Sequence, residues 1–157
     1  MALGDRDRVN AMLAGNPSLL DEFTPDGFLP AGLAIFFRHP ELARELIDRG
    51  ADIHAAARNA QGVAPVHAAA SVCDTASMQL LLERGANPNA RQHLGYVPLH
   101  ASAANGDRAT AELLVAHGAD SNASNDDGKT PADFAAERGH HELAEWLRRQ
   151  PEKPTTP

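Results

Sequence analysis

The segment Gly95-Tyr96-Val97-Pro98-Leu99-His100-Ala101-Ser102-Ala103 is the clearest guide to the fold, because its pattern returns along the chain at a nearly constant interval. The glycine that opens it recurs at intervals of 35, 33 and 33 residues, and a proline follows each such glycine three residues later. The four opening glycines are Gly27, Gly62, Gly95 and Gly128. A period near 33 residues is typical of stacked supersecondary units, which usually bind other molecules rather than transform them.

Each period predicts the same series of elements. The proline suits the first turn of a helix, where a backbone N–H is not needed, and a short run of small and apolar residues follows it. After a break comes a longer helix, which ends at a glycine able to adopt the left-handed conformation. These closing glycines are Gly50, Gly85 and Gly118. A segment rich in Asn and Asp then predicts an extended hairpin, called a finger below, that leads into the next unit.

The recurring motifs resemble those of the ankyrin repeat. The family's Gly-x-Thr-Pro-Leu-His-x-Ala-Ala is similar to residues 62–70, to residues 95–103 and, with changes, to residues 128–136. The family's Leu-Leu-x-x-Gly-Ala-Asp-x-Asn-Ala is similar to residues 81–90 and 114–123. The resemblance implies an all-α solenoid, an ankyrin-repeat stack of helix-turn-helix units with hairpin fingers.

The resemblance extends over about residues 4–149 and divides the chain into units. We expect a partial N-terminal repeat at 1–24, repeats at 25–57, 58–92 and 93–125, a C-terminal capping repeat at 126–150, and a disordered tail at 151–157. In the second helix of the last unit, Arg148 stands where the earlier units carry Ile47, Leu82 and Val115. A charge at that position indicates that no further unit packs there.

The N-terminal part is expected to be half a unit. Residues 5–14 predict the second helix of a unit, with residues 1–4 as the stub of its first helix. Either the natural start lies upstream or this half unit frays. Residues 16–21 predict a turn and one short helical stretch before the first full unit.

The first full unit, which starts at Gly27, departs most from the family pattern. Leu29-Pro30-Ala31-Gly32 replaces Thr-Pro-Leu-His, and Glu45 occupies a position that is apolar in the other units. We therefore expect the junction between the first and second full units to be the least stable internal junction. The capping threonine of the motif survives only as Thr130, and a lost cap costs about 1 kcal/mol per helix, which predicts ordinary stability.

The composition argues against several functional classes. The net charge is −7 and no cluster of Lys and Arg is present, so we expect no nucleic-acid binding. No apolar run approaches the roughly 20 residues of a membrane span, and no secretory signal is visible. The single cysteine fits a reducing compartment, so we expect a cytoplasmic monomer. Arginine far outnumbers lysine in this Ala-rich chain, which suggests a GC-rich bacterial genome.

Candidate catalytic side chains have simpler explanations. His67 and His100 match the family's structural histidine, which hydrogen-bonds to neighbouring backbone. Cys73 could be a nucleophile, but no motif places a base beside it. The segment His141-Glu142-Leu143-Ala144-Glu145 approaches a zinc-protease motif but lacks the second histidine. We therefore expect no enzyme activity, no cofactor and no metal.

The resemblance implies that another protein binds the concave face, formed by the finger tips and the exposed sides of the first helices. The positions that match the family's binding positions supply apolar anchors and acidic selectors for a partner. The anchors are Phe28, Phe36, Phe37, Val63, Leu94 and Tyr96, and the selectors are Asp126 and Asp127.

Alternatives remain open for several of these residues. Phe36 and Phe37 would otherwise cover the poorly formed first unit or pack under residues 16–24. Asp126 and Asp127 would otherwise be ordinary turn residues beside Gly128. The module as a whole is either a general interaction module or an inhibitor or immunity-type protein that blocks an enzyme or toxin, for which the acidic charge suits a basic target.

Overall fold

The computed structural model describes residues 3–151, and these residues form helices and loops without a strand. The all-α solenoid class is therefore confirmed. The predicted tail at 151–157 lies outside the described residues except for Pro151. The elements are α1 (Leu3–Gly15), η1 (Pro17–Asp21), α2 (Pro30–Phe36), α3 (Pro40–Asp48), α4 (Pro65–Ser71), α5 (Thr75–Glu83), η2 (His93–Gly95), α6 (Pro98–Ala104), α7 (Arg108–Ala116), α8 (Pro131–Glu137) and α9 (His141–Arg148).

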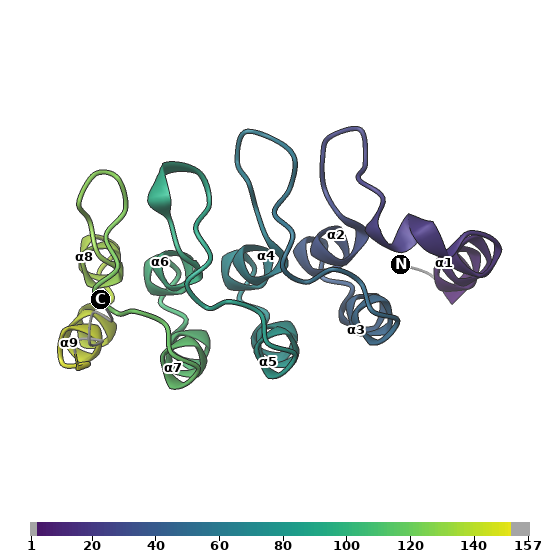
Figure 1. Cartoon of the computed structure of the whole chain (residues 1–157). Coiled ribbons are helices and arrows are strands. Elements are labelled where there is room, and N and C mark those ends of the chain that lie inside the picture. Colours follow the sequence, from purple (N-terminus) through teal and green to yellow (C-terminus); the bar gives the residue numbers. More distant parts are fainter. Residues whose placement is uncertain (1–2, 152–157) are drawn as a thin grey trace.

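The helices form two rows (Figure 1). The first helices α2, α4, α6 and α8 make one row, and the second helices α3, α5, α7 and α9 make the other. The fingers project beyond the row of first helices, all on the same side (Figure 1). Each unit therefore contacts mainly its neighbours along the stack, as expected for a solenoid.

Local chemistry sets the helix boundaries. A proline stands in the first turn of α2, α4, α6 and α8, as the sequence predicts. The closing glycines Gly50, Gly85 and Gly118 have φ values of 93°, 87° and 89°, which confirms the left-handed helix ends. The break between paired helices also needs a left-handed residue, and there Arg38 and Cys73 carry φ values of 58° and 56° without being glycine.

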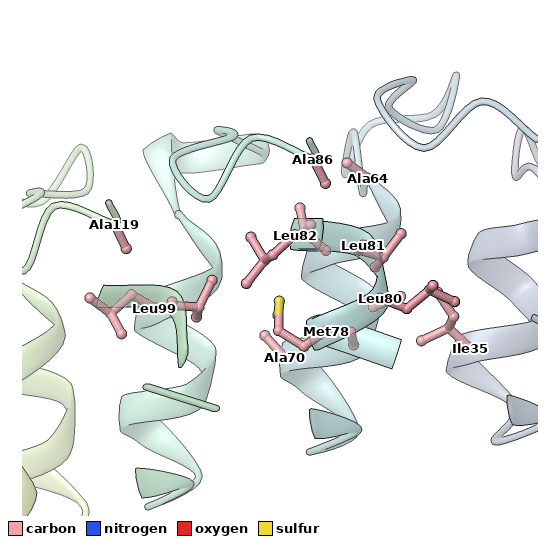
Figure 2. Close-up of a cluster of buried hydrophobic side chains, with 14 of the residues drawn as sticks. Ile35, Ala64, Ala70, Met78, Leu80, Leu81, Leu82, Ala86, Leu99 and Ala119 are labelled. Atoms are coloured by element: carbon pink, nitrogen blue, oxygen red, sulfur yellow. The ribbon is translucent and has the colours of Figure 1, made fainter. Parts of the chain in front are cut away.

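The core runs between the two rows as one cluster of buried apolar side chains. Figure 2 shows the α5 side chains Met78 and Leu81 between Ile35 of α2 and Leu99 of α6, and all four of these residues are fully buried. Small side chains such as Ala70 let neighbouring helices approach closely. Burial of these apolar surfaces against adjacent units supplies most of the stabilisation, since each short helix is marginal alone.

Backbone hydrogen bonds join neighbouring fingers. The Arg58 N–H donates to the Gly27 carbonyl at 2.7 Å, and the His93 N–H donates to the Gln61 carbonyl at 2.9 Å. The last pair of fingers is joined by the Asp126 N–H, which donates to the Leu94 carbonyl at 3.0 Å. The finger tips are thus held relative to one another, so side chains on them are presented in fixed positions.

The N-terminal half unit differs from the prediction in one respect. Helix α1 begins at Leu3, so Leu3 and Gly4 continue the helix predicted at 5–14 and do not belong to the stub of another helix. A glycine in a helix costs only about 1 kcal/mol, which does not force a break at Gly4. The short helical stretch predicted at 16–21 is confirmed by η1, and the Asn16 side chain caps it by accepting the Ser18 N–H at 3.2 Å.

Candidate functional site

The two motif histidines, His67 and His100, are structural. The Ala64 N–H donates to His67 Nδ1 at 3.2 Å, and His67 Nε2 donates to the Ala90 carbonyl at 2.9 Å. His100 makes the same pair of bonds in the next unit, with the Val97 N–H and the Lys129 carbonyl, each at 3.1 Å. Each neutral imidazole therefore links the start of its helix to the following finger.

Burial supports the neutral form of these rings. Desolvation is the main reason that the pKa of His67 and of His100 lies below its ordinary value, with backbone hydrogen bonds opposing it. A protonated ring could not accept the N–H at Nδ1, so the charged form would break the helix-start bond. The two histidines are occupied by the fold and are poor candidates for chemistry.

Cys73 is exposed in the break between α4 and α5. Partial desolvation and then the nearby Asp107 carboxylate raise the pKa of its thiol, which keeps it protonated and weakly nucleophilic. In the described part of the chain no group of three or more His, Cys, Asp or Glu side chains is placed to hold a metal ion.

The predicted partner-binding residues fall into two separate groups. Phe28, Phe36, Phe37 and Val63 lie together around one apolar hollow between α2 and the start of α4. The others, which are Leu94, Tyr96, Asp126 and Asp127, lie on the third and fourth fingers. The structure therefore brings four of the predicted anchors into one site and places the remaining residues at a distance along the stack.

The hollow beside α2 measures about 380 Å³ and its lining is mainly apolar. This size lies within the range of about 300–1,000 Å³ that is usual for ligand pockets. The rings of Phe36 and Phe37 meet edge to face, 5.5 Å apart at 86°, and they remain 51% and 63% exposed. Such exposure does not fit the alternative in which these rings pack under residues 16–24, whereas the alternative in which they cover the first unit remains compatible with it.

Tyr96 belongs to an internal aromatic cluster. Its ring centroid lies 5.4 Å from that of His100 and 5.5 Å from that of Phe134, and the His100 and Phe134 rings are 5.5 Å apart. All three contacts are edge to face, and Tyr96 is half-buried. Lys129 extends the cluster, since its ammonium lies 5.8 Å from the Phe134 ring centroid. Tyr96 therefore stabilises the junction of two units and offers only part of its surface to a partner.

Leu94 and the two acidic selectors lie at finger tips. Leu94 is 48% exposed and has a φ of 59°, an unfavourable conformation for a non-glycine residue. Asp126 and Asp127 are exposed turn residues, and the Asp127 N–H donates to the Asn125 side chain at 3.1 Å. Their backbone shapes the turn while their carboxylates stay on the surface, so the two interpretations of these aspartates are compatible.

Two features were not predicted from the sequence. The Arg91 guanidinium donates to the Gly95 and Ser124 carbonyls, each at 3.3 Å, and so ties the third finger to the fourth. A second apolar hollow lies between α1, η1 and α2, where Met12 is 60% exposed. Neither has a motif, because both depend on contacts between segments that are distant in the sequence.

A comparison with protein families supports the fold independently. The family model of ankyrin repeats (3 copies) matches residues 66–156, which is more than half of the chain. A comparison with curated proteins finds no match. Among the described helices none is long and apolar enough to span a membrane. Ankyrin repeats are generally protein–protein interaction modules and are generally non-catalytic. By its repeats, its helix pairs and this match, the chain belongs to the ankyrin-repeat family.

Proposed function

We propose that this protein is a non-catalytic interaction module that binds a partner protein through its fingers and first helices. The observation that carries the proposal is the apolar hollow edged by the exposed rings of Phe36 and Phe37. Large apolar side chains exposed around a hollow are the usual mark of an interaction site, and aromatic residues dominate binding hot spots. Phe28 and Val63 complete the anchor region.

The remaining predicted residues form a second, weaker contact region. Leu94 and the exposed part of Tyr96 offer apolar surface, and Asp126 with Asp127 select a partner with basic residues at this end. The backbone bonds between fingers support this arrangement, because a surface that is already ordered loses little conformational entropy on binding. We place the module in the cytoplasm as a monomer, in keeping with its free thiol at Cys73.

A second candidate function uses the same face. The exposed Asp126 and Asp127 and the net charge of −7 favour a basic target, so the module could be an inhibitor or immunity-type protein that blocks an enzyme or toxin. An enzyme that loses activity in stoichiometric titration with the protein would establish the inhibitory role. Binding without loss of activity would leave the general interaction module.

Site-specific photo-crosslinking tests the proposed face directly. A photoreactive phenylalanine analogue placed at Phe37 should crosslink one partner protein in cells of the source organism. The same analogue at Gln79, which is exposed on α5 in the other row of helices, should not capture that protein. Equal capture from both positions, or capture from Gln79 alone, would move the interface away from the fingers and overturn the proposal.

A further inference from the structure

The aromatic cluster of Tyr96, His100 and Phe134 lies at the third junction, between the units that start at Gly95 and Gly128. Comparison with it shows which rings the first junction, between the units that start at Gly27 and Gly62, lacks. The cluster is built by Tyr96, one residue after its opening glycine, by His100, two residues after its proline, and by Phe134, three residues after the next unit's proline. These three rings fill the space between the third and fourth fingers and the helices beneath them. Each ring meets the other two at 5.4–5.5 Å, so the three rings pack together in this space.

The corresponding positions of the first junction are Phe28, Gly32 and Ala68. All three line the hollow beside α2. Two of the three rings are therefore absent, since a glycine stands in place of the imidazole and an alanine in place of the phenylalanine. A Cβ built on Gly32 would have no heavy atom of a neighbouring segment within 4 Å among the described residues. The hollow is thus an aromatic cluster with one ring present and the places of two rings open.

We propose that the partner completes this cluster by inserting an aromatic side chain into the hollow, between Phe28, Gly32 and Ala68. This inference rests on the proposed function and names the chemistry that the hollow selects. Aromatic pairs prefer edge-to-face contact at about 4.5–7 Å, and Phe36 and Phe37 at the mouth already stand in that relation to each other. An inserted ring would meet the Phe28 ring as Phe134 meets Tyr96.

The rim of the hollow specifies the residue beside that ring. Asp26 lies on the rim, and its backbone carbonyl is held by the Asn59 side-chain amide at 3.1 Å. The Asp26 carboxylate is exposed and takes part in none of the ion pairs between described side chains. A carboxylate on the edge of an apolar hollow attracts a cation. The partner segment that inserts the aromatic side chain therefore carries Lys or Arg next to that aromatic residue.

A displayed library of random peptides, selected on the whole chain, tests the inference. We expect the enriched peptides to share an aromatic residue next to Lys or Arg. The matched pair of variants is Gly32→Leu, which fills the hollow, and Gly15→Leu, which adds the same side chain at an exposed glycine of α1 outside the hollow. Binding of an enriched peptide should fall at least about tenfold in Gly32→Leu and stay unchanged in Gly15→Leu. That factor corresponds to about 1.4 kcal/mol.

Two further measurements keep the result decisive. Circular dichroism reports whether the Gly32→Leu variant folds. If that variant does not fold, Phe36→Ala, a change at an exposed ring, replaces it and should weaken binding of the same peptides. Asp26→Asn should reduce binding and its salt dependence together. Enriched peptides without an aromatic residue, an empty selection, or peptides that bind Gly32→Leu as well as the parent protein would each overturn the inference.

The two proposals fail in different ways. If crosslinking from Phe37 captures a partner whose binding is unaffected by Gly32→Leu, the face is correct and the inserted ring is wrong. If aromatic peptides bind the hollow but no cellular partner is captured from Phe37, the hollow is a ligand site and the proposed interaction with a partner protein falls.

Discussion

The unit that starts at Gly27 and the unit that starts at Gly95 have the same order of elements but different side chains at their shared positions. At the later unit, His100 and Phe134 close the space beneath the fingers with rings. At the earlier unit, Gly32 and Ala68 leave that space open, and the rings of Phe36 and Phe37 stand exposed at its edge. The same order of elements thus carries a cluster of packed rings toward one end of the stack and an apolar hollow toward the other.

This contrast has an energetic meaning. A buried histidine that joins a helix start to the next finger satisfies two backbone groups, and a missing histidine leaves that link out of the first unit. Binding sites are often less stable than the scaffold around them, because their exposed apolar surface contributes to stability only when a partner covers it. The four predictions below test this contrast, in decreasing order of the expected effect.

The largest effect is expected from removing the ring that closes the later unit. His100→Ala should lower the free energy of unfolding by about 3 kcal/mol, because the Val97 N–H and the Lys129 carbonyl lose their partner and a cavity opens. Urea unfolding followed by circular dichroism measures the loss. A loss below about 1 kcal/mol would mean that the imidazole links contribute little, and the contrast between the two units would lose its energetic basis.

The natural difference between the two units should be visible in hydrogen exchange. Amides of α2 and α3 should open at a free energy about 2 kcal/mol lower than those of α6 and α7, because the first unit lacks the imidazole link. Native-state exchange resolved by peptide and mass spectrometry makes this comparison within one sample. Equal protection of both pairs would contradict the expectation that the first junction is the weakest internal one.

A single methyl group should make the first unit more stable without closing its hollow. Gly32→Ala is expected to raise the free energy of unfolding by about 1 kcal/mol, since it removes a helix-interior glycine and the new Cβ meets open space. The reverse substitution is Ala101→Gly in α6, one position beyond the equivalent of Gly32, and it should lower stability by at least a similar amount. Thermal unfolding of both variants beside the parent protein shows whether the signs are opposite.

The smallest effects concern pH. Because burial holds the pKa of His67 and His100 below the ordinary value of 6.5, the unfolded chain binds protons first as the pH falls below that value. Their contribution to stability is therefore complete above about pH 6.5 and is lost as the pH falls toward the folded-state pKa. His67→Asn should flatten the fall in stability between about pH 7 and pH 5, as measured by urea unfolding at each pH.

The last unit provides the internal comparison for that experiment. Asp133 stands at the histidine position, and hydrogen bonds from the Thr130 N–H and hydroxyl hold its pKa below the ordinary value of 3.8. Its contribution to stability is present above that value and is lost only in more acidic solution. Asp133→Asn should therefore leave the fall in stability between about pH 7 and pH 5 unchanged. If Asp133→Asn flattened the fall in stability over this pH range as His67→Asn does, the histidines would not be the source of that fall.

Repetition in the chain was sufficient to predict the fold. The prolines and the closing glycines act through the conformation of their own backbone, so their positions predict the helix starts and the helix ends. The family motif also implied the hydrogen bonds of the histidines to nearby backbone, of which the bond from the Ala64 N–H to His67 is local. The prediction was less successful at the N-terminus, where helix α1 continues through Leu3 and Gly4. A partial unit offers no second motif from which its register can be read.

The candidate site was predictable only as a set of exposed positions. The family pattern predicted that Phe28, Phe36 and Phe37 face a partner, but it did not indicate that they surround a common hollow. It also treated Tyr96 as a free anchor, whereas the ring packs on Phe134 of the next unit. Both findings depend on contacts across units, which a repeat motif does not encode.

Local conformational preference and the spacing of small, apolar and turn residues were therefore enough to predict the repeat and the helices, and the resemblance to the family implied the structural role of the histidines. Packing between units decided where the molecule is closed and where it is open. Gly32 is an unremarkable helical residue until the short side chain of Ala68, 36 residues later, comes to lie across the same space. A hollow is a property of two surfaces brought together, so only the tertiary structure reveals it.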